Sequence, residues 1–301
     1  MRADPQLRPS PPFCAAHDLS YASAAETRGG RVVIRALENA TGRLHLMRRA
    51  RGVEHEITPG CTVFDALVDR YGLSLNIVGG AIDYIGKSGP VIVIANHPYG
   101  ILDGMMMGHL LGQRRPDFRI MANAVFAGSP DIQDMLLPID FNDTKQALAG
   151  NLETRRAALA HLDQGGCIGV FPGGTVSTGA RPFARPMDPA WRNFTARLIA
   201  KSDAVVVPVY FDGKTSKLFQ LVSHLHATLR HGLLLKEFRA RVDSPVNVAI
   251  GRPLGRDVLD PLAKDGKAMM DFLRKATYEL APEPLDSFDA GYDFEDRRRR
   301  R

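Results

Sequence analysis

Short apolar runs alternate with helix-length segments along most of the chain, and this alternation restricts the folds that it can adopt. The apolar runs are mostly bounded by Gly, Pro, Asn or Asp, and they cover residues 75–78, 91–95, 119–122, 167–171, 204–210 and 246–250. Helix-length segments lie between several of them, at residues 104–111, 144–164, 191–201 and 218–235. Strands that are buried on both faces read as continuous apolar runs, and helices between them cover the faces of a mainly parallel sheet. The sequence therefore predicts an α/β fold with a mainly parallel or mixed sheet flanked by helices.

Length and composition predict one main domain. A chain of 301 residues with 45% hydrophobic residues can bury one large core. Residues 1–28 are rich in Pro, Ala and Ser and lack periodicity, so we expect them to be poorly ordered. Residues 29–285 are predicted to form a single α/β domain that starts with a helical layer, including a helix at 62–71, and that carries its motifs within about residues 74–255. Residues 286–301 are predicted to form a basic C-terminal tail.

Charge and cysteine content limit the possible classes of protein. Cys14, Cys61 and Cys167 are widely spaced, so neither a disulfide framework nor a cysteine metal site is predicted. The formal net charge of +6 suits an anionic membrane surface, an acidic carrier protein or nucleic acid, without choosing among them. No run approaches the roughly 20 apolar residues of a membrane-spanning helix, and the N-terminus lacks the features of a secretory signal. We therefore expect a cytoplasmic protein that lies on a bilayer, rather than across it, if it acts on lipid.

The residues after the apolar run at 91–95 carry the strongest chemical signal. Asn96 and His97 follow a predicted buried strand, at the sheet edge where reactive groups gather in such folds. A proline and a glycine interrupt helix formation just beyond, so the chain must loop and Asp103 can fold back toward His97. A carboxylate that accepts from one imidazole nitrogen leaves the other nitrogen as a base for an alcohol proton. We predict that His97 is the catalytic base and Asp103 its orienting residue; in the alternative interpretation, Asp103 is only the N-cap of a helix at 104–111.

A second motif follows the run at 167–171. Adjacent glycines leave backbone N–H groups free to face an anion, hydroxyl groups add donors, and two arginines can bind phosphate or carboxylate. The predicted site for the polar end of an acceptor consists of Gly173, Gly174, Thr175, Ser177, Arg181 and Arg185. In the alternative interpretation, the glycines form a tight turn and the hydroxyl groups cap a turn or helix.

Two other enzyme classes fit this loop less well. A nucleotide-binding P-loop ends in Gly-Lys-Ser/Thr, and no lysine occurs between Lys145 and Lys201. A serine hydrolase elbow has the pattern Gly-x-Ser-x-Gly, and here the first glycine stands one position too early relative to Ser177. A hydrolase of lipid esters stays open as an alternative.

The motifs together resemble those of the glycerophospholipid acyltransferase family, the relatives of lysophosphatidic acid acyltransferase. That family has Asn-His followed closely by Asp, and later a Phe-Pro-Glu-Gly-Thr-x-Ser block. In the same order, this chain has Asn96, His97 and Asp103, the block at 171–177, and Val-Val-Pro-Val at 206–209. The resemblance covers about residues 74–255.

The resemblance implies that an acyl group moves from an acyl-carrier protein or coenzyme A thioester to the hydroxyl of a lysolipid, without a cofactor or a metal ion. It implies membrane lipid, an acyl carrier and an anionic membrane surface as partners, no nucleic acid, and a position on the inner face of the cytoplasmic membrane. Asn96 is expected to take part in substrate binding. Asn123 loosely matches the family's second block and is expected near the acceptor. Leucines at helical spacing after residue 217, with basic residues around them, are typical of a helix that lies in a bilayer interface or packs on the sheet.

Two departures from the family pattern bear on the acceptor. Five residues separate His97 from Asp103 instead of four, as in the branch that contains proteins labelled hemolysins. Gly173 and Val176 replace the glutamate and arginine that help to hold the acceptor in that family. An arginine further along the loop is expected to substitute, or the acceptor is another lysolipid, such as a lyso-ornithine lipid. A non-catalytic protein that binds or perturbs membranes is a further alternative.

Overall fold

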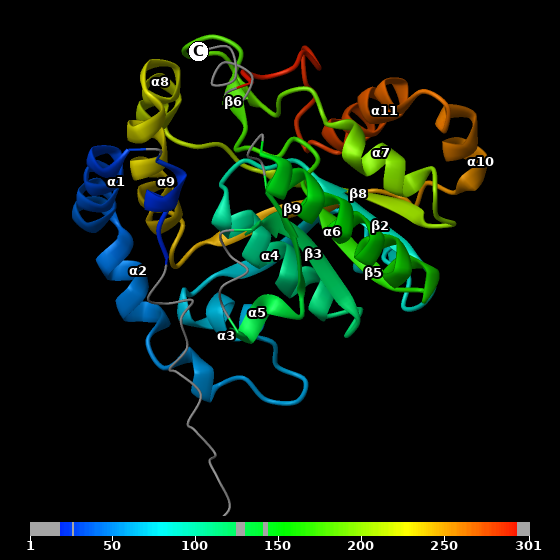
Figure 1. The fold of residues 1–301 in the computed structure, drawn as a ribbon, viewed down its shortest axis with the longest axis horizontal. Helices are drawn as coiled ribbons and strands as arrows, with labels where there is room; N and C mark the ends of the chain where they lie inside the picture. The colour runs from blue at the N-terminus through cyan, green and yellow to red at the C-terminus, as the bar shows by residue number, and fades with distance from the viewer. Residues whose placement is uncertain (1–18, 26, 125–129, 141–143, 294–301) are drawn as a thin grey trace, which may run out of the picture.

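The computed structural model describes residues 19–25, 27–124, 130–140 and 144–293 (Figure 1). At its centre is a seven-stranded sheet with the strand order β1-β9-β8-β2-β5-β3-β4. Neighbouring strands pair in parallel, except for the antiparallel pair β8 and β9. The strands are β1 Ser74–Gly79, β2 Val91–Ala95, β3 Phe118–Asn123, β4 Leu136–Ile139, β5 Cys167–Val170, β8 Val205–Asp212 and β9 Pro245–Ile250. The predicted α/β class with a mainly parallel sheet is confirmed.

Every apolar run that predicted a strand forms one, whereas the edge strand β4 was not predicted. β4 is only four residues long and contains Pro138, which cannot donate to a neighbouring strand. An edge strand tolerates the missing N–H group because it has a neighbouring strand on one side only. A short and proline-containing run therefore gives a weak sequence signal even where it completes a sheet.

The side chains of β2 alternate between two separate hydrophobic cores. Val91, Val93 and Ala95 pack in the core beneath α3 and α4, and Ile92 and Ile94 pack in the core beneath α6, α7 and α11. These helices are α3 Val63–Arg70, α4 Ile101–Gly112, α6 Lys145–Asp163, α7 Asn193–Ile199 and α11 Gly266–Tyr278. Because both faces of β2 are buried, the only place where this strand can present a reactive group is its end.

A layer of helices from both halves of the chain lies beside the sheet (Figure 1). It consists of α1 Arg28–Thr41, α2 Arg43–Ala50, α8 Lys217–Leu225 and α9 Ala227–Arg239, and α1 and α8 both pack against α9. The predicted single helix at 218–235 is two helices, because His226 has an extended backbone, with φ −154°, and its side chain accepts from the N–H of Thr228 to cap α9. The remaining helices are short: η1 Ala22–Ala24, η2 Val53–His55, η3 Ile82–Tyr84, α5 Pro130–Gln133, α10 Arg256–Leu259 and η5 Asp260–Leu262.

The expectation of poor order through residue 28 is wrong for its last part. The Ser20 hydroxyl donates to Glu38 of α1 at 2.5 Å, and the N–H of Tyr21 donates to the same carboxylate at 2.6 Å. Glu38 is fully buried, so these bonds fix the chain before α1 begins. Residues 1–18 lie outside the described residues.

The predicted C-terminal tail at 286–301 also needs correction where it is described. The N–H of Gly291 donates to the carbonyl of Asp188 at 2.8 Å, and the N–H of Tyr292 donates to the carbonyl of Thr178 at 3.0 Å. The segment up to residue 293 therefore packs beside a small two-stranded sheet formed by β6 Thr178–Gly179 and β7 Pro186–Met187. The five terminal arginines lie outside the described residues.

Candidate active site

The loop that follows β2 is held by hydrogen bonds at its start and by close packing at its end. The side-chain amide of Asn96 donates to the carbonyl of Phe211 at 3.0 Å, and its oxygen accepts from the N–H of Phe211 at 2.7 Å. Gly100 has a φ of 84°, a conformation that favours glycine, and a Cβ atom there would lie 3.1 Å from the Tyr21 hydroxyl. His97 is thereby held at the end of β2, immediately before α4 begins.

His97 and Asp103 come together as predicted. Nδ1 of His97 lies 3.0 Å from Oδ2 of Asp103, and the same oxygen accepts from the N–H groups of Tyr99 at 2.7 Å and Gly100 at 2.9 Å. Nδ1 is buried and does not make a well-aligned hydrogen bond with this oxygen, as is common for catalytic groups in substrate-free sites. Asp103 does not precede its helix, as the alternative interpretation had it. It lies in the first turn of α4, where its carboxylate holds both the loop and the histidine.

The Asp103 carboxyl is fully buried, and its surroundings act on its charge in opposite directions. Burial raises the pKa of Asp103, whereas His97 and the N–H groups of Tyr99 and Gly100 lower it. Its position in the first turn of a helix also favours a negative charge. The site therefore provides a carboxylate whose charge is best compensated when the neighbouring imidazole is protonated.

The other face of the site leaves His97 able to act as a base. The His97 ring stacks on Phe171, with ring centres 4.4 Å apart, and its side chain is 18% exposed. Its Nε2 atom has no hydrogen-bond partner among the residues that the structure describes. A ring that is oriented through Nδ1, supported on one face and unpaired at Nε2 has the arrangement that proton abstraction from an alcohol requires.

The loop at residues 173–177, called the glycine-threonine loop below, lies directly against His97. The N–H of Ser177 donates to the carbonyl of His97 at 2.8 Å. Gly174 has a φ of 68° and turns the chain as it leaves β5, and its N–H donates to the carbonyl of Phe171 at 3.0 Å. The Ser177 hydroxyl is buried and donates to Asp188, so it does not present a nucleophile beside the histidine. This geometry gives no support to the hydrolase alternative.

Two buried charged residues that were not predicted fix this loop from behind. Asp188 accepts from the N–H of His97 at 3.1 Å and from the Ser177 hydroxyl at 2.5 Å. Arg230 of α9 donates to the carbonyl of Val176 at 2.8 Å and to the Thr175 hydroxyl at 3.3 Å. Arg230 is 54 residues from Val176, and Asp188 reaches the loop only because the hairpin of β6 and β7 folds it back, so local sequence spacing did not indicate either residue.

The structure places the other predicted site residues further from the histidine. Arg181 and Arg185 lie between β6 and β7 with exposed side chains, and Arg185 reaches the Tyr210 hydroxyl. Asn123 is exposed at the end of β3, which β5 separates from β2. The Asn96 side chain is occupied by the Phe211 backbone. Substrate contacts of these residues stay predictions.

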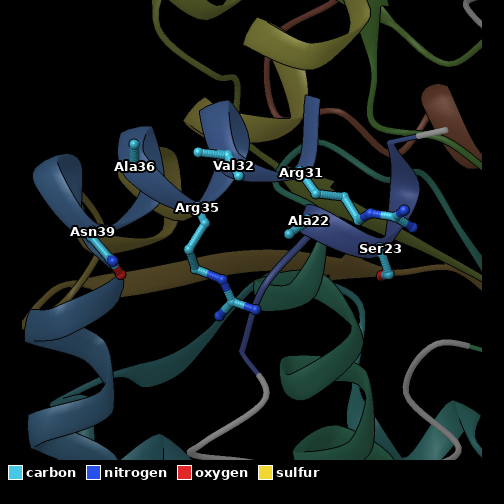
Figure 2. Close-up of a pocket in the computed structure, with 7 residues that line it drawn as sticks. All are labelled: Ala22, Ser23, Arg31, Val32, Arg35, Ala36 and Asn39. Atoms are coloured by element: carbon cyan, nitrogen blue, oxygen red, sulfur yellow. The ribbon is translucent and has the colours of Figure 1, made fainter. Parts of the chain in front are cut away.

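Two further observations on the described residues leave this assignment unchanged. No group of three or more His, Cys, Asp or Glu side chains that could bind a metal occurs in the described part of the chain. A hollow in the helical layer is lined by Ala22, Ser23, Arg31, Val32, Arg35, Ala36 and Asn39, and it contains none of the predicted site residues (Figure 2).

A histidine beside a buried carboxylate, at the carboxyl end of a parallel strand, has the arrangement that general-base chemistry requires. The model of a family described as "Acyltransferase" matches residues 54–291, and the chain therefore belongs to this acyltransferase family. A solved structure titled as the 1-acyl-sn-glycerophosphate (LPA) acyltransferase PlsC from Thermotoga maritima is 16% identical, over 88% of this chain and 87% of that chain, with a TM-score of 0.44. A likeness of that degree supports no conclusion of its own. No curated protein matches the chain.

Proposed function

We propose that this acyltransferase moves a fatty acyl group from an acyl-carrier protein or coenzyme A thioester to the hydroxyl of a lysolipid. The observation that carries the proposal is the 3.0 Å contact between Nδ1 of His97 and the buried Asp103, with Nε2 unpaired among the described residues. Membership of the acyltransferase family supports acyl transfer in general. The lysolipid acceptor and the thioester donor rest on the motif resemblance.

The proposed reaction needs only the protein's own base. Nε2 of His97 takes the proton of the acceptor hydroxyl as the oxygen forms a bond to the thioester carbonyl carbon. The tetrahedral adduct then expels the thiolate, which receives that proton from the imidazolium. Asp103 stabilises the imidazolium between these two steps, and no acyl-enzyme forms.

The acceptor's polar end is proposed to lie on the glycine-threonine loop. Thr175 is half-exposed beside the buried Ser177, and Gly173 and Gly174 bring the backbone close to a bound group. Because no glutamate or arginine stands within the block, Arg181 or Arg185 is proposed to supply the charge that neutralises a phosphate or carboxylate. Both a lysophosphatidic acid-like and a lyso-ornithine-lipid-like acceptor fit this chemistry.

Purified protein tests the proposal directly. Wild type is incubated with acyl-carrier protein or coenzyme A thioesters and with a panel of lysolipids, and both diacyl product and free fatty acid are measured. We expect diacyl product that is lost on changing His97→Gln, and retained after Ser177→Ala at a reduced rate. Free fatty acid as the main product, lost in Ser177→Ala, would support the hydrolase instead. Full acyl transfer by His97→Gln would eliminate the mechanism.

We further propose that the enzyme acts on an anionic membrane surface on the inner face of the cytoplasmic membrane. Within the described residues, no helix is both long and apolar enough to span a membrane. The helical layer instead exposes large apolar side chains, which are Val32, Val33, Leu218, Leu225 and Leu229. Arg31 and Arg35 extend along the hollow on the same layer (Figure 2). Apolar side chains bordered by basic ones suit the interface of an anionic bilayer.

Vesicle sedimentation tests the membrane proposal without turnover. Wild type should bind vesicles that contain anionic lipid more strongly than zwitterionic ones. Leu225→Glu should weaken binding, because the 66% exposed Leu225 would no longer enter the interface. Leu148→Glu is the matched control, since Leu148 is equally exposed, at 66%, on α6 on the other face of the sheet. Equal binding by all three proteins would refute this surface.

A further inference from the structure

The Asp188 carboxylate lies where a side chain at position 173 would lie. A Cβ atom built on Gly173 would be 3.1 Å from Oδ2 of Asp188 and 3.3 Å from its Cγ. Position 173 is where the related motif carries a glutamate, and here the space is filled by an acid from fifteen residues further along the chain. A buried acid therefore fills the space beside position 173, although the block itself carries none.

The contacts of this carboxylate join the base to the acceptor loop. Oδ1 of Asp188 accepts from the N–H of His97 and from the hydroxyl of Ser177, and Oδ2 accepts from Nε1 of Trp191 at 2.9 Å. All three are donors, so only a carboxylate satisfies them together. Asp188 is fully buried and leaves no room for substrate, so its effect on the reaction must pass through His97 and the loop.

The backbone of Asp188 is held as firmly as its side chain. Its N–H donates to the Tyr278 hydroxyl at 2.7 Å, and its carbonyl accepts from Arg274 at 2.9 Å and from the N–H of Gly291 at 2.8 Å. Helix α11 and the C-terminal segment thus fix the position from which the carboxylate reaches His97. A fixed anchor is what a positioning residue requires.

We propose that Asp188 is a positioning residue for the acyl transfer, which sets the distance between His97 and the glycine-threonine loop. This inference rests on the proposed function for its kinetic test but not for its structural one. Removing a group that aligns a catalytic base lowers kcat more than it raises KM, because misalignment acts on the transition state.

The main experiment moves the carboxylate from position 188 to position 173. Asp188→Asn should lower kcat about 100-fold and leave the acceptor KM within about threefold. Gly173→Asp alone should also be impaired, because two carboxylates would compete for one space. The double variant Asp188→Gly with Gly173→Asp should regain at least about tenfold over Asp188→Gly, since Gly173 does not have a positive φ and accepts a side chain. Asp65→Asn is the structural control: it changes a carboxylate that meets His109 rather than His97, and its kcat should stay within about threefold.

Histidine ring NMR of the substrate-free protein separates this inference from the proposed function. The His97 ring signals, identified by their absence in His97→Gln, should shift in Asp188→Asn and return toward wild type in the relocated double variant. Unchanged His97 signals in a folded Asp188→Asn protein would overturn the inference, whether or not acyl transfer is detected. A folded double variant that is no more active than Asp188→Gly would overturn it equally.

A second inference comes from the turn between β6 and β7. Phe183 has a φ of 68°, which is unfavourable for a bulky aromatic residue, and its side chain is 73% exposed. The N–H of Ala184 closes the turn by donating to the carbonyl of Arg181 at 3.0 Å. Arg181, Pro182 and Phe183 are all exposed, so the turn presents a ring and a guanidinium to solvent together. No packing contact in the described structure accounts for this strained conformation.

We infer that this turn inserts into the interface of an anionic bilayer. An aromatic ring enters the boundary between head groups and acyl chains, and the adjacent Arg181 meets the lipid phosphates. The turn follows directly from the acceptor loop, so its insertion would bring that loop to the membrane surface from which a lysolipid arrives.

Substitution by asparagine tests this inference because it should weaken vesicle binding without lowering the stability of the fold. Asn tolerates a positive φ, so Phe183→Asn should not lower the melting temperature, yet it should weaken binding to anionic vesicles about tenfold. Phe272→Asn, at the 36% exposed phenylalanine of α11, is the control and should bind as wild type does. Undiminished vesicle binding by Phe183→Asn would refute the inference, and a lowered melting temperature would show that the ring serves the fold.

Discussion

Helix α4 has a histidine-carboxylate pair at each end, and comparing them shows why only one of them is suited to the proposed catalytic role. His97 meets Asp103 at the beginning of the helix, and His109 in its last turn meets Asp65 of α3. The nitrogen-to-oxygen distance is 3.0 Å in the first pair and 2.6 Å in the second, and both imidazoles are 18% exposed. By distance alone, the second pair would be chosen as the catalytic one.

The surroundings of the distal histidine nitrogens and of the carboxylates favour the first pair instead. Nε2 of His109 lies 2.9 Å from the Gln113 side chain, and Asp65, 22% exposed, also accepts from the hydroxyl and N–H of Thr62 to cap α3. The second pair is therefore a cross-link between two helices. In the first pair the carboxyl is fully buried and the distal nitrogen of the histidine has no partner among the described residues. An unpaired distal nitrogen and a buried acid, rather than a short distance, mark the base.

Exchanging each histidine for glutamine is the strongest test of this comparison. His97→Gln should lower kcat by at least about 1,000-fold, because the proton acceptor is lost while the fold keeps a polar side chain of similar size. His109→Gln should leave kcat within about threefold and lower the free energy of unfolding by about 1 kcal/mol, since it breaks a partly exposed cross-link between two helices. Acyl-transfer kinetics and urea unfolding of both variants measure the two effects. Equal kinetic losses in the two variants would remove the distinction.

The contact between His97 and Asp103 was predictable from the sequence because the motif keeps its members close together. A strand buried on both faces reads as one apolar run, and it delivers Asn96 and His97 to a sheet edge whatever the rest of the fold does. The start of α4 was less predictable. Gly100 ends the loop, and the helix begins at Ile101, so Asp103 binds from inside the first turn rather than from before it. Local propensity does not fix a helix start to within three residues when tertiary contacts hold the loop.

The supporting residues were not predictable because nothing local identifies them. Asp188 follows a short hairpin, and Arg230 lies on α9 within a helix that reads as an amphipathic surface element. Their roles come from the packing of the C-terminal segment and the helical layer against the loop. The second histidine pair escaped prediction for the same reason, since Asp65 and His109 stand 44 residues apart on two helices.

Exchanging the carboxylates gives the next largest expected effect. Asp103→Asn should lower kcat about 100- to 1,000-fold, because the amide oxygen that keeps the bonds to the N–H groups of Tyr99 and Gly100 carries no negative charge to stabilise the imidazolium. Asp65→Asn should leave kcat nearly unchanged and cost about 1 kcal/mol of unfolding free energy through the lost cap and cross-link. Steady-state kinetics and urea unfolding of the two variants test this. An active Asp103→Asn enzyme would show that the orienting role belongs elsewhere.

The pH dependence of stability should differ between wild type and the Asp103→Asn variant. Burial raises the pKa of Asp103, so the folded state binds a proton more tightly there than the unfolded state, whose carboxyl titrates at about pH 4. Stability from this group is therefore present below the unfolded pKa and is lost as the pH rises through the raised pKa. The amide that replaces the carboxyl does not titrate. As the pH rises from about 4 through the raised pKa, wild type should therefore lose free energy of unfolding relative to Asp103→Asn. Urea unfolding at several pH values from about 4 to about 8 measures the difference, and a parallel pH dependence of the two proteins would contradict it.

The smallest expected effect comes from giving the second pair one of the features that it lacks, an unpaired distal nitrogen. Gln113→Leu removes the partner of Nε2 in His109 and should cost only about 0.5 to 1 kcal/mol of unfolding free energy, because Gln113 is exposed. The released nitrogen should confer no activity when the change is combined with His97→Gln. Asp65 stays partly solvated and shared with the cap of α3, and His109 has no acceptor loop beside it comparable to the one that Ser177 joins to His97. Recovery of acyl transfer in the double variant would mean that a free nitrogen beside any carboxylate is sufficient; its absence would show that the buried acid and the adjoining loop are also required.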